Sequence, residues 1–190
     1  MDKTGIRTSY RERRMHLSPG EAMSMQKRIF DLFRGLQLPS LQVLHRYIPD
    51  PKGGEPDPEP LAEWLVTANP GLIQALPRVF DDDPVMKAVE SDESTRLEPN
   101  RWGIPEPVAG RVISPEDIDM VMVPLLAFDL KGHRVGHGKG YYDRFLEICR
   151  RDCLKVGLSF FEPVDAIGDA DAHDVRLDLC ITPSKVYEFH

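Results

Sequence analysis

The chain has 190 residues, a length that suits one hydrophobic core and predicts a single domain over residues 1–190. Its 24 lysines and arginines stand against 31 aspartates and glutamates, so the net charge of −7 has the wrong sign for a protein that coats nucleic acid. The three cysteines lack metal-ligand spacing, and the start of the chain has no apolar signal core. The chain also has no apolar run long enough to span a bilayer, so we expect a cytoplasmic protein outside the membrane.

The first predicted elements are two helices. Residues 4–17 read as a basic helix whose face carries several positive charges. Its basic side chains are Arg7, Arg11, Arg13 and Arg14. A second helix begins after Ser18, which can cap the first turn while Glu21 reaches back to the cap amide, and its apolar face extends to Leu36.

The middle of the chain alternates strands with helices. Residues 41–48 predict a strand, and the prolines and paired glycines of residues 49–58 exclude regular structure, so a loop follows. A helix at about 59–68 and a strand at 72–80 come next, and residues 84–90 are expected to pair beside that strand. This alternation is typical of an α/β fold.

A fully apolar segment marks the predicted centre of the sheet. Residues 119–124 read DMVMVP and are apolar on both faces, as expected of a central parallel strand covered by helices. We expect this strand to lead directly into a glycine-rich loop and then into a helix at 141–151. Strands near 155–160 and 179–182 complete a largely parallel central sheet flanked by helices.

The glycine-rich loop has the parts of a phosphate site. Its glycines are Gly136, Gly138 and Gly140. Glycines allow positive φ and let backbone amides approach a phosphate, while the next helix presents its positive end. Arg134 and Lys139 add positive charge, and Asp143 supplies the hard oxygen that Mg²⁺ prefers.

The spacing of these glycines matches neither of two common nucleotide motifs. It lacks the Gly-x-x-x-x-Gly-Lys-Ser/Thr pattern, and its third glycine comes one residue too early for Gly-x-Gly-x-x-Gly. A turn that merely connects a strand to a helix remains the alternative. By itself, the pattern indicates an anion-binding loop.

A longer pattern resembles a known family. Residues 132–143 read GHRVGHGKGYYD, which resembles the signature of the 5-formyltetrahydrofolate cyclo-ligases. Lys3 and Arg7 resemble that family's N-terminal basic motif, residues 102–107 (WGIPEP) its Trp/Phe-x-Ile-Pro-Glu-Pro segment, and Asp174 its C-terminal aspartate. Order and spacing agree along essentially the whole chain.

The resemblance implies a NagB/RpiA/CoA-transferase-like α/β fold with Rossmann-like layering. It also implies an enzyme that uses ATP and Mg²⁺ to convert 5-formyltetrahydrofolate into 5,10-methenyltetrahydrofolate, ADP and phosphate, through phosphorylation of the formyl oxygen. The expected partner is a small reduced folate, without nucleic acid or membrane, and we expect a monomer.

The family's site residues are carried over onto matching positions. The catalytic residues that the resemblance implies are Arg134 and Lys139. Those implied for ATP are Lys3, Arg7, Arg134, Val135, Gly136, His137, Gly138, Lys139, Gly140, Tyr141 and Tyr142. Those implied for the folate are Glu55, Trp102, His137, Gly138, Lys139, Gly140 and Tyr141. The implied Mg²⁺ ligands are Asp143 and Asp174.

Each of these residues also has a structural interpretation. Trp102 can be a partly buried core aromatic, Glu55 ordinary loop polarity, and Asp174 a surface carboxylate. Asp143 can instead cap the helix at 141–151. Two other functions use the same parts: an ATP-dependent kinase or ligase on another small acid, and a catalytically silent ligand-binding domain. The sequence identifies no general base.

Overall fold

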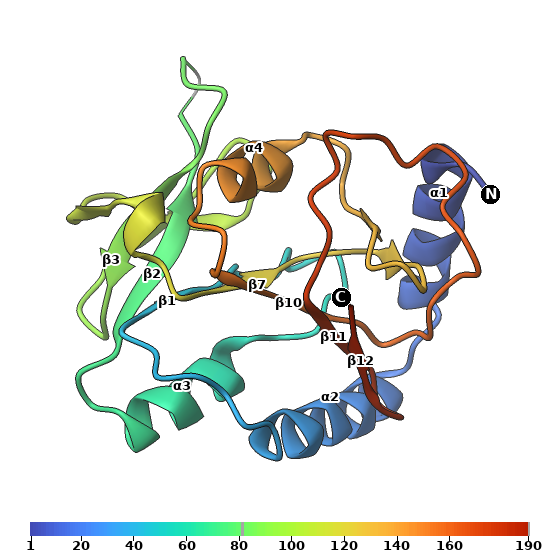
Figure 1. Cartoon of the computed structure of the whole chain (residues 1–190), viewed down its shortest axis with the longest axis horizontal. Helices are drawn as coiled ribbons and strands as arrows, with labels where there is room; N and C mark the ends of the chain where they lie inside the picture. The colour runs from blue at the N-terminus through green and yellow to red at the C-terminus, as the bar shows by residue number, and fades with distance from the viewer. Residues whose placement is uncertain (81, 190) are drawn as a thin grey trace.

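The centre of the fold is an eight-stranded sheet, seen in a computed structural model that describes residues 1–80 and 82–189 (Figure 1). Its strands, in chain order, are β1 (Val43–His45), β2 (Ile73–Arg78), β3 (Lys87–Ser91), β6 (Val112–Ile113), β7 (Met120–Val123), β10 (Leu154–Leu158), β11 (Leu179–Ile181) and β12 (Val186–Glu188). The order across the sheet is β12-β11-β10-β7-β1-β2-β3-β6. Pairing is parallel from β11 to β2 and antiparallel at both edges, which confirms the largely parallel α/β sheet.

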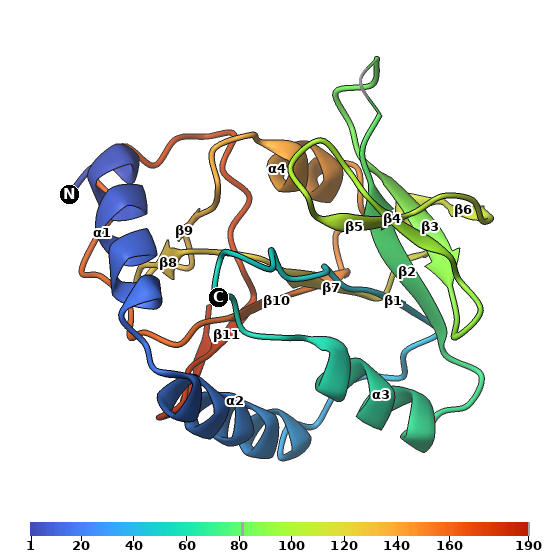
Figure 2. The same ribbon diagram turned by 180° about the vertical axis from the view of Figure 1, so that it is seen from behind.

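Helices cover both faces of this sheet. They are α1 (Lys3–Met15), α2 (Pro19–Arg34), α3 (Glu59–Ala68) and α4 (Tyr141–Glu147), with a short 3-10 turn at Pro115–Asp117. Figures 1 and 2 show α2 and α3 on one face and α4 on the other, with α1 at the end of the sheet. None of the helices in the described residues is long and apolar enough to cross a membrane.

Strand β7 explains why its segment is apolar on both faces. Met120 and Met122 pack with the buried residues of α2 and α3, whereas Val121 and Val123 pack with those of α4. All four side chains have 0% exposure. The prediction of a central parallel strand is confirmed, since β7 pairs in parallel with both β1 and β10.

The helix predictions hold, but α1, α2 and α4 end earlier than predicted, at Met15, Arg34 and Glu147. The capping box of α2 is present, because Ser18 accepts a hydrogen bond from the Glu21 amide and the Glu21 side chain accepts one from the Ser18 amide. Helix α3 has the predicted bounds. Helix α4 ends at Glu147 rather than at residue 151, and Arg150 turns back to an ion pair of 2.5 Å with Asp119.

The expectation that β7 leads directly into the glycine loop is wrong. A hairpin of β8 (Ala127–Phe128) and β9 (Arg134–Val135) lies between them. Asp129 fixes its turn, because its buried carboxylate accepts hydrogen bonds from the amides of Lys131, His133 and Ile167. A second small sheet, of β4 (Leu97–Pro99) and β5 (Pro105–Pro107), was not predicted.

Candidate active site

A cavity of about 480 Å³ opens beside the carboxyl ends of the parallel strands. Tyr47 follows β1, Pro77 lies in β2 and Pro124 follows β7, and all three line the cavity. Ligands of open α/β sheets bind at this edge, where loops from neighbouring strands converge. Further walls come from the glycine loop, α1, the start of α4, the β4–β5 hairpin and the loop after β1.

Positive side chains gather at one end of the cavity. Lys3 and Arg7 reach it from α1, and the Arg7 Nε donates a hydrogen bond of 3.0 Å to the Gly136 carbonyl of the glycine loop. Lys139 is exposed, and its side chain has no hydrogen bond or ion pair within the described residues. Its Nζ lies 5.9 Å from the centre of the Trp102 ring. This ammonium is therefore available to an anionic ligand.

Arg134 contrasts with Lys139, because it is buried and paired. Its Nη2 donates to Asp143 Oδ1 at 2.8 Å and its Nη1 donates to the Val175 carbonyl. Burial lowers the pKa of Arg134, while the neighbouring Asp143 carboxylate opposes that shift. The guanidinium thus contributes a fixed charge to the cavity wall.

Two carboxylates lie beside these cations. Asp143 Oδ1 accepts hydrogen bonds from Arg134 and from the Val175 amide, and its Oδ2 has no partner within the described residues. Asp174 binds Lys3 Nζ through both oxygens, at 2.6 and 2.8 Å. Burial raises the pKa of Asp174, but the Lys3 contact and the Asp171 amide outweigh it and hold the pKa below its usual range.

This donor set fits a divalent cation that is shared with a ligand. The described residues contain no group of three or more histidine, cysteine, aspartate or glutamate side chains that could hold a metal by themselves. Mg²⁺ commonly takes one or two carboxylates and completes its shell with substrate phosphates and water. Asp143 offers a free oxygen in the cavity that suits this arrangement. The alternative that Asp143 caps α4 is wrong, because this helix begins after Gly140 without a side-chain cap.

The glycine loop requires its glycines. Gly138 has φ +91° and a Cβ there would lie 3.2 Å from the Arg7 guanidinium carbon. Gly140 has φ +70° and a Cβ there would lie 2.8 Å from Arg144 Nη1. Larger residues would strain the backbone and displace these arginines. The loop lines the cavity directly, which argues against a turn that only connects two elements.

An aromatic wall faces the loop. Trp102 is 39% exposed and its ring meets that of Tyr141 edge to face, with centroids 6.0 Å apart. The Asn100 side chain holds the segment around Trp102. Its Oδ1 accepts a hydrogen bond of 2.9 Å from the Trp102 amide, and its Nδ2 donates one of 2.6 Å to Glu106 Oε1. Trp102 is therefore not the core aromatic of the structural interpretation but part of the cavity lining.

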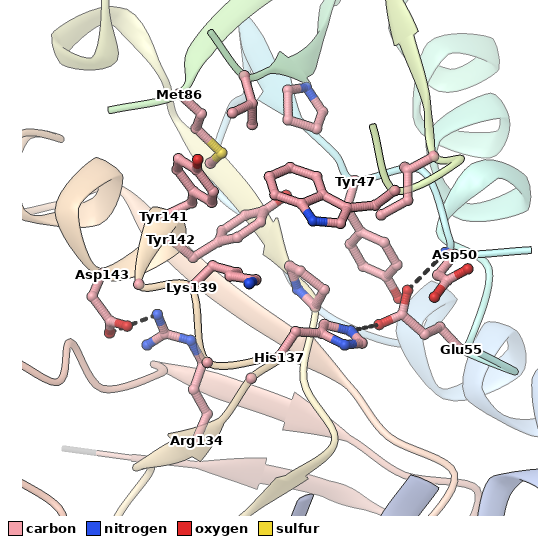
Figure 3. A pocket seen from close by; sticks show the side chains of 18 of the residues that line it. Tyr47, Asp50, Glu55, Met86, Arg134, His137, Lys139, Tyr141, Tyr142 and Asp143 are labelled. Atoms are coloured by element: carbon pink, nitrogen blue, oxygen red, sulfur yellow. Dashed lines mark hydrogen bonds and ion pairs between the residues drawn. The ribbon is translucent and has the colours of Figure 1, made fainter. Parts of the chain in front are cut away.

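A polar cluster closes the other end of the cavity (Figure 3). His137 Nε2 lies 2.8 Å from Glu55 Oε1, and the Asp50 amide donates to Glu55 Oε2 at 3.0 Å. Arg14 Nη1 lies 3.6 Å from Glu55 Oε1. Burial raises the pKa of Glu55, but these contacts, led by the His137 hydrogen bond, outweigh it and leave the pKa below its ordinary value.

The structure gathers nearly all the residues expected at the site. The expected residues that line the cavity are Lys3, Arg7, Glu55, Trp102, Arg134, Gly136, His137, Gly138, Lys139, Gly140, Tyr141, Tyr142, Asp143 and Asp174. Val135 is the exception, because its buried side chain packs with Ile6 and Tyr10 instead. Arg14 was expected on the charged face of α1 but is only 4% exposed. Lining residues that the sequence did not indicate are Arg11, Tyr47, Ile48, Asp50, Pro77, Val79, Met86, Asn100 and Pro124.

Comparisons with known proteins give one consistent result. A model of the 5-formyltetrahydrofolate cyclo-ligase family matches residues 1–183. The chain is 44% identical over 70 residues to the 5-formyltetrahydrofolate cyclo-ligase of Mycoplasma genitalium. This alignment covers 36% of this chain and 41% of that protein. It is 35% identical over 117 residues to the probable 5-formyltetrahydrofolate cyclo-ligase of Schizosaccharomyces pombe, over 54% and 57% of the two chains. These alignments therefore span about half the length of the curated relatives.

A solved structure extends the similarity to the full chain. The NMR structure of 5,10-methenyltetrahydrofolate synthetase from Aquifex aeolicus gives a TM-score of 0.83 at 30% identity. The match covers 100% of this chain and 94% of that chain.

Proposed function

Because the chain belongs to the 5-formyltetrahydrofolate cyclo-ligase family, we propose that it converts 5-formyltetrahydrofolate and ATP into 5,10-methenyltetrahydrofolate, ADP and phosphate, with Mg²⁺ as the metal. The substrate is then a small reduced folate, and we propose a cytoplasmic monomer without nucleic-acid or membrane partners.

One observation carries this proposal. The glycine loop, the kind of site that holds phosphates, carries a lysine without an ion pair among the described residues. It shares a single cavity with the Trp102–Tyr141 aromatic wall, which suits a flat pterin ring. A phosphoryl donor and a folate would therefore meet at residues 136–140. A volume of about 480 Å³ lies within the usual range for small-molecule sites.

The chemical difficulty is the leaving group. A formamide oxygen does not depart as hydroxide at a useful rate, so the formyl oxygen of the folate takes the γ-phosphoryl group of ATP first. N10 of the folate then attacks the formyl carbon, and phosphate leaves. Lys139 and Arg134 stabilise negative charge on the transferring phosphoryl group, and the glycine loop positions that group.

Asp143 and Asp174 would hold the metal, which neutralises phosphate charge when it is bound. Asp143 would bind through the oxygen that Arg134 leaves free. Lys3 would exchange its contact with Asp174 for a phosphate oxygen, or would bridge the two.

The test is a product assay. The purified protein is incubated with 5-formyltetrahydrofolate and Mg-ATP, and methenyltetrahydrofolate absorbance and ADP are followed together. We expect both products in equal amounts and neither without its co-substrate. Absence of the methenyl product at saturating substrates would rule the function out. ADP formation with another small acid in place of the folate would favour a kinase or ligase.

A further inference from the structure

We propose that His137 accepts the proton that folate N10 releases during ring closure, and that Glu55 and Arg14 are positioning residues for its imidazole. The inference rests on the proposed function and adds to it the proton acceptor of the reaction. It concerns a step that the phosphate-binding residues cannot perform, because Lys139 and Arg134 are cations without a basic lone pair.

The two ring nitrogens of His137 have different surroundings. Nε2 lies 2.8 Å from Glu55 Oε1, whereas Nδ1 has no protein partner within the described residues. The side chain is 35% exposed and lines the cavity. Glu55 carries a lowered pKa and is therefore an anion, so in the neutral form of the ring the proton lies on Nε2 and is donated to this carboxylate. The remaining lone pair is then on Nδ1, which is the form that a proton acceptor requires.

Glu55 is fixed in a way that suits this role. Its side chain is only 4% exposed, and its two oxygens are taken by His137 and by the Asp50 amide. When the imidazole gains a proton, the positive charge forms 2.8 Å from a buried carboxylate and is stabilised there. This is how a carboxylate both orients an imidazole and stabilises its charged form.

Arg14 connects this pair to the sheet. Its side chain is 1% exposed, its Nη2 donates to the Leu125 carbonyl just after β7, and its Nη1 lies 3.6 Å from Glu55. Burial lowers the pKa of Arg14, and the Glu55 carboxylate opposes this shift. A buried cation beside Glu55 keeps this carboxylate charged and fixes its position against the central strand.

The position of His137 fits the place of ring closure. Figure 3 shows its ring between Arg134 and Lys139 on one side and Glu55 on the other. The phosphorylated formyl carbon must lie where the phosphate end meets the folate end, and N10 attacks that carbon. Asp174 and Tyr142 are less suited to accept this proton, since Asp174 binds Lys3 and burial raises the pKa of Tyr142 well above its usual range.

The step balances without another reactant. The lone pair of N10 forms the new bond to the formyl carbon, and the N10 proton moves to His137 Nδ1. The carbon–oxygen bond to phosphate then breaks, and phosphate leaves with its electron pair. The methenyl product keeps the positive charge, and His137 returns its proton to solvent.

The principal test uses His137→Gln, which keeps an amide N–H near the position of Nε2 for Glu55 but has no basic nitrogen. In a single turnover with 5-formyltetrahydrofolate and Mg-ATP, we expect methenyl formation to slow by about 100-fold or more, the usual worth of a general base. The melting temperature should stay near its wild-type value. The matched control is His133→Gln. The His133 imidazole does not line the cavity, and its Nδ1 lies 3.2 Å from Asp129 Oδ2.

Chemical rescue separates proton transfer from packing. Imidazoles of increasing pKa should restore the single-turnover rate of His137→Ala, and the rescued rate should rise with the pKa of the added base. A rescue that does not depend on that pKa, or a His137→Gln rate equal to wild type, would overturn the inference. If the wild-type protein forms no methenyl product at all, the proposed function fails first, and the two failures are thereby distinguished.

A double-variant cycle tests Glu55 as a positioning residue. Glu55→Gln should lower the single-turnover rate without raising KM for ATP. The double variant Glu55→Gln/His137→Gln should have a single-turnover rate close to that of His137→Gln alone. If the two losses multiply instead, Glu55 acts independently of His137, and its positioning role is refuted.

Discussion

Lys139 offers the sharpest separation of catalysis from stability. Replacing it by methionine removes the ammonium but keeps an unbranched apolar side chain of similar length. The wild-type side chain is exposed and makes no ion pair within the described residues. Within the described residues, its Nζ lies 5.9 Å from the centre of the Trp102 ring.

The expected magnitudes follow from these contacts. Losing an exposed cation–π contact costs about 0.5–1 kcal/mol of folding free energy. Losing one charged donor that faces a developing negative charge costs about 3 kcal/mol of transition-state stabilisation, or roughly 100-fold in rate. Activity should therefore fall strongly while stability hardly changes.

Two measurements check the Lys139→Met prediction. Steady-state kinetics over a range of ATP concentrations should show a lower kcat and a higher KM for ATP, and urea unfolding should show a free energy close to wild type. Lys131→Met is the control, because Lys131 is exposed in the β8–β9 turn and does not line the cavity. Unchanged kinetics at limiting and saturating ATP would refute the role of Lys139.

Three further predictions concern single positions. Asp143→Asn should raise the Mg²⁺ concentration for half-maximal activity, while the amide oxygen still accepts a hydrogen bond from Arg134 and keeps the metal-free melting temperature near wild type. Gly138→Ala should raise KM for ATP, because its φ is +91° and its Cβ would press on Arg7 at 3.2 Å. Asp119→Ala should lower the free energy of unfolding by about 3 kcal/mol, because the Asp119 carboxylate accepts a hydrogen bond from the Val43 amide and forms an ion pair with Arg150. Its lowered pKa means that this stability is present at neutral pH and lost on acidification below about pH 4.

Each of these has a contrary result. An unchanged Mg²⁺ titration would leave Asp143 only as the partner of Arg134. A wild-type KM in Gly138→Ala would show that Arg7 does not contact the nucleotide. Asp119→Ala as stable as wild type in urea at pH 7, or equally sensitive to acid, would contradict the account of that carboxylate.

Local patterns predicted the framework of this fold. Residues 119–124 predicted a central strand, because a strand that is buried on both faces is apolar at successive positions. The capping box at Ser18 fixed the start of α2 through hydrogen bonds between neighbours in the sequence. The glycine loop could be recognised from the sequence, because the positive φ angles at Gly138 and Gly140 favour glycine at these positions.

Long-range contacts explain what local patterns missed. The β8–β9 hairpin depends on Asp129, which also accepts the amide of Ile167, and no sequence rule links these positions. Arg14 looked like its exposed neighbours in α1, and its burial follows only from its contacts with Leu125 and Glu55. The Glu55–His137 pair joins residues 82 positions apart, so the resemblance supplied both residues but not their contact.

One measurement addresses the central claim most directly, which is that the formyl oxygen leaves as part of phosphate. 5-Formyltetrahydrofolate labelled with ¹⁸O in the formyl group is converted with unlabelled Mg-ATP, and the inorganic phosphate is analysed by mass spectrometry. We predict one ¹⁸O atom per phosphate for each methenyltetrahydrofolate formed. Phosphate without label, with the ¹⁸O recovered in water, would mean that ATP hydrolysis and cyclisation are separate events and would contradict the account.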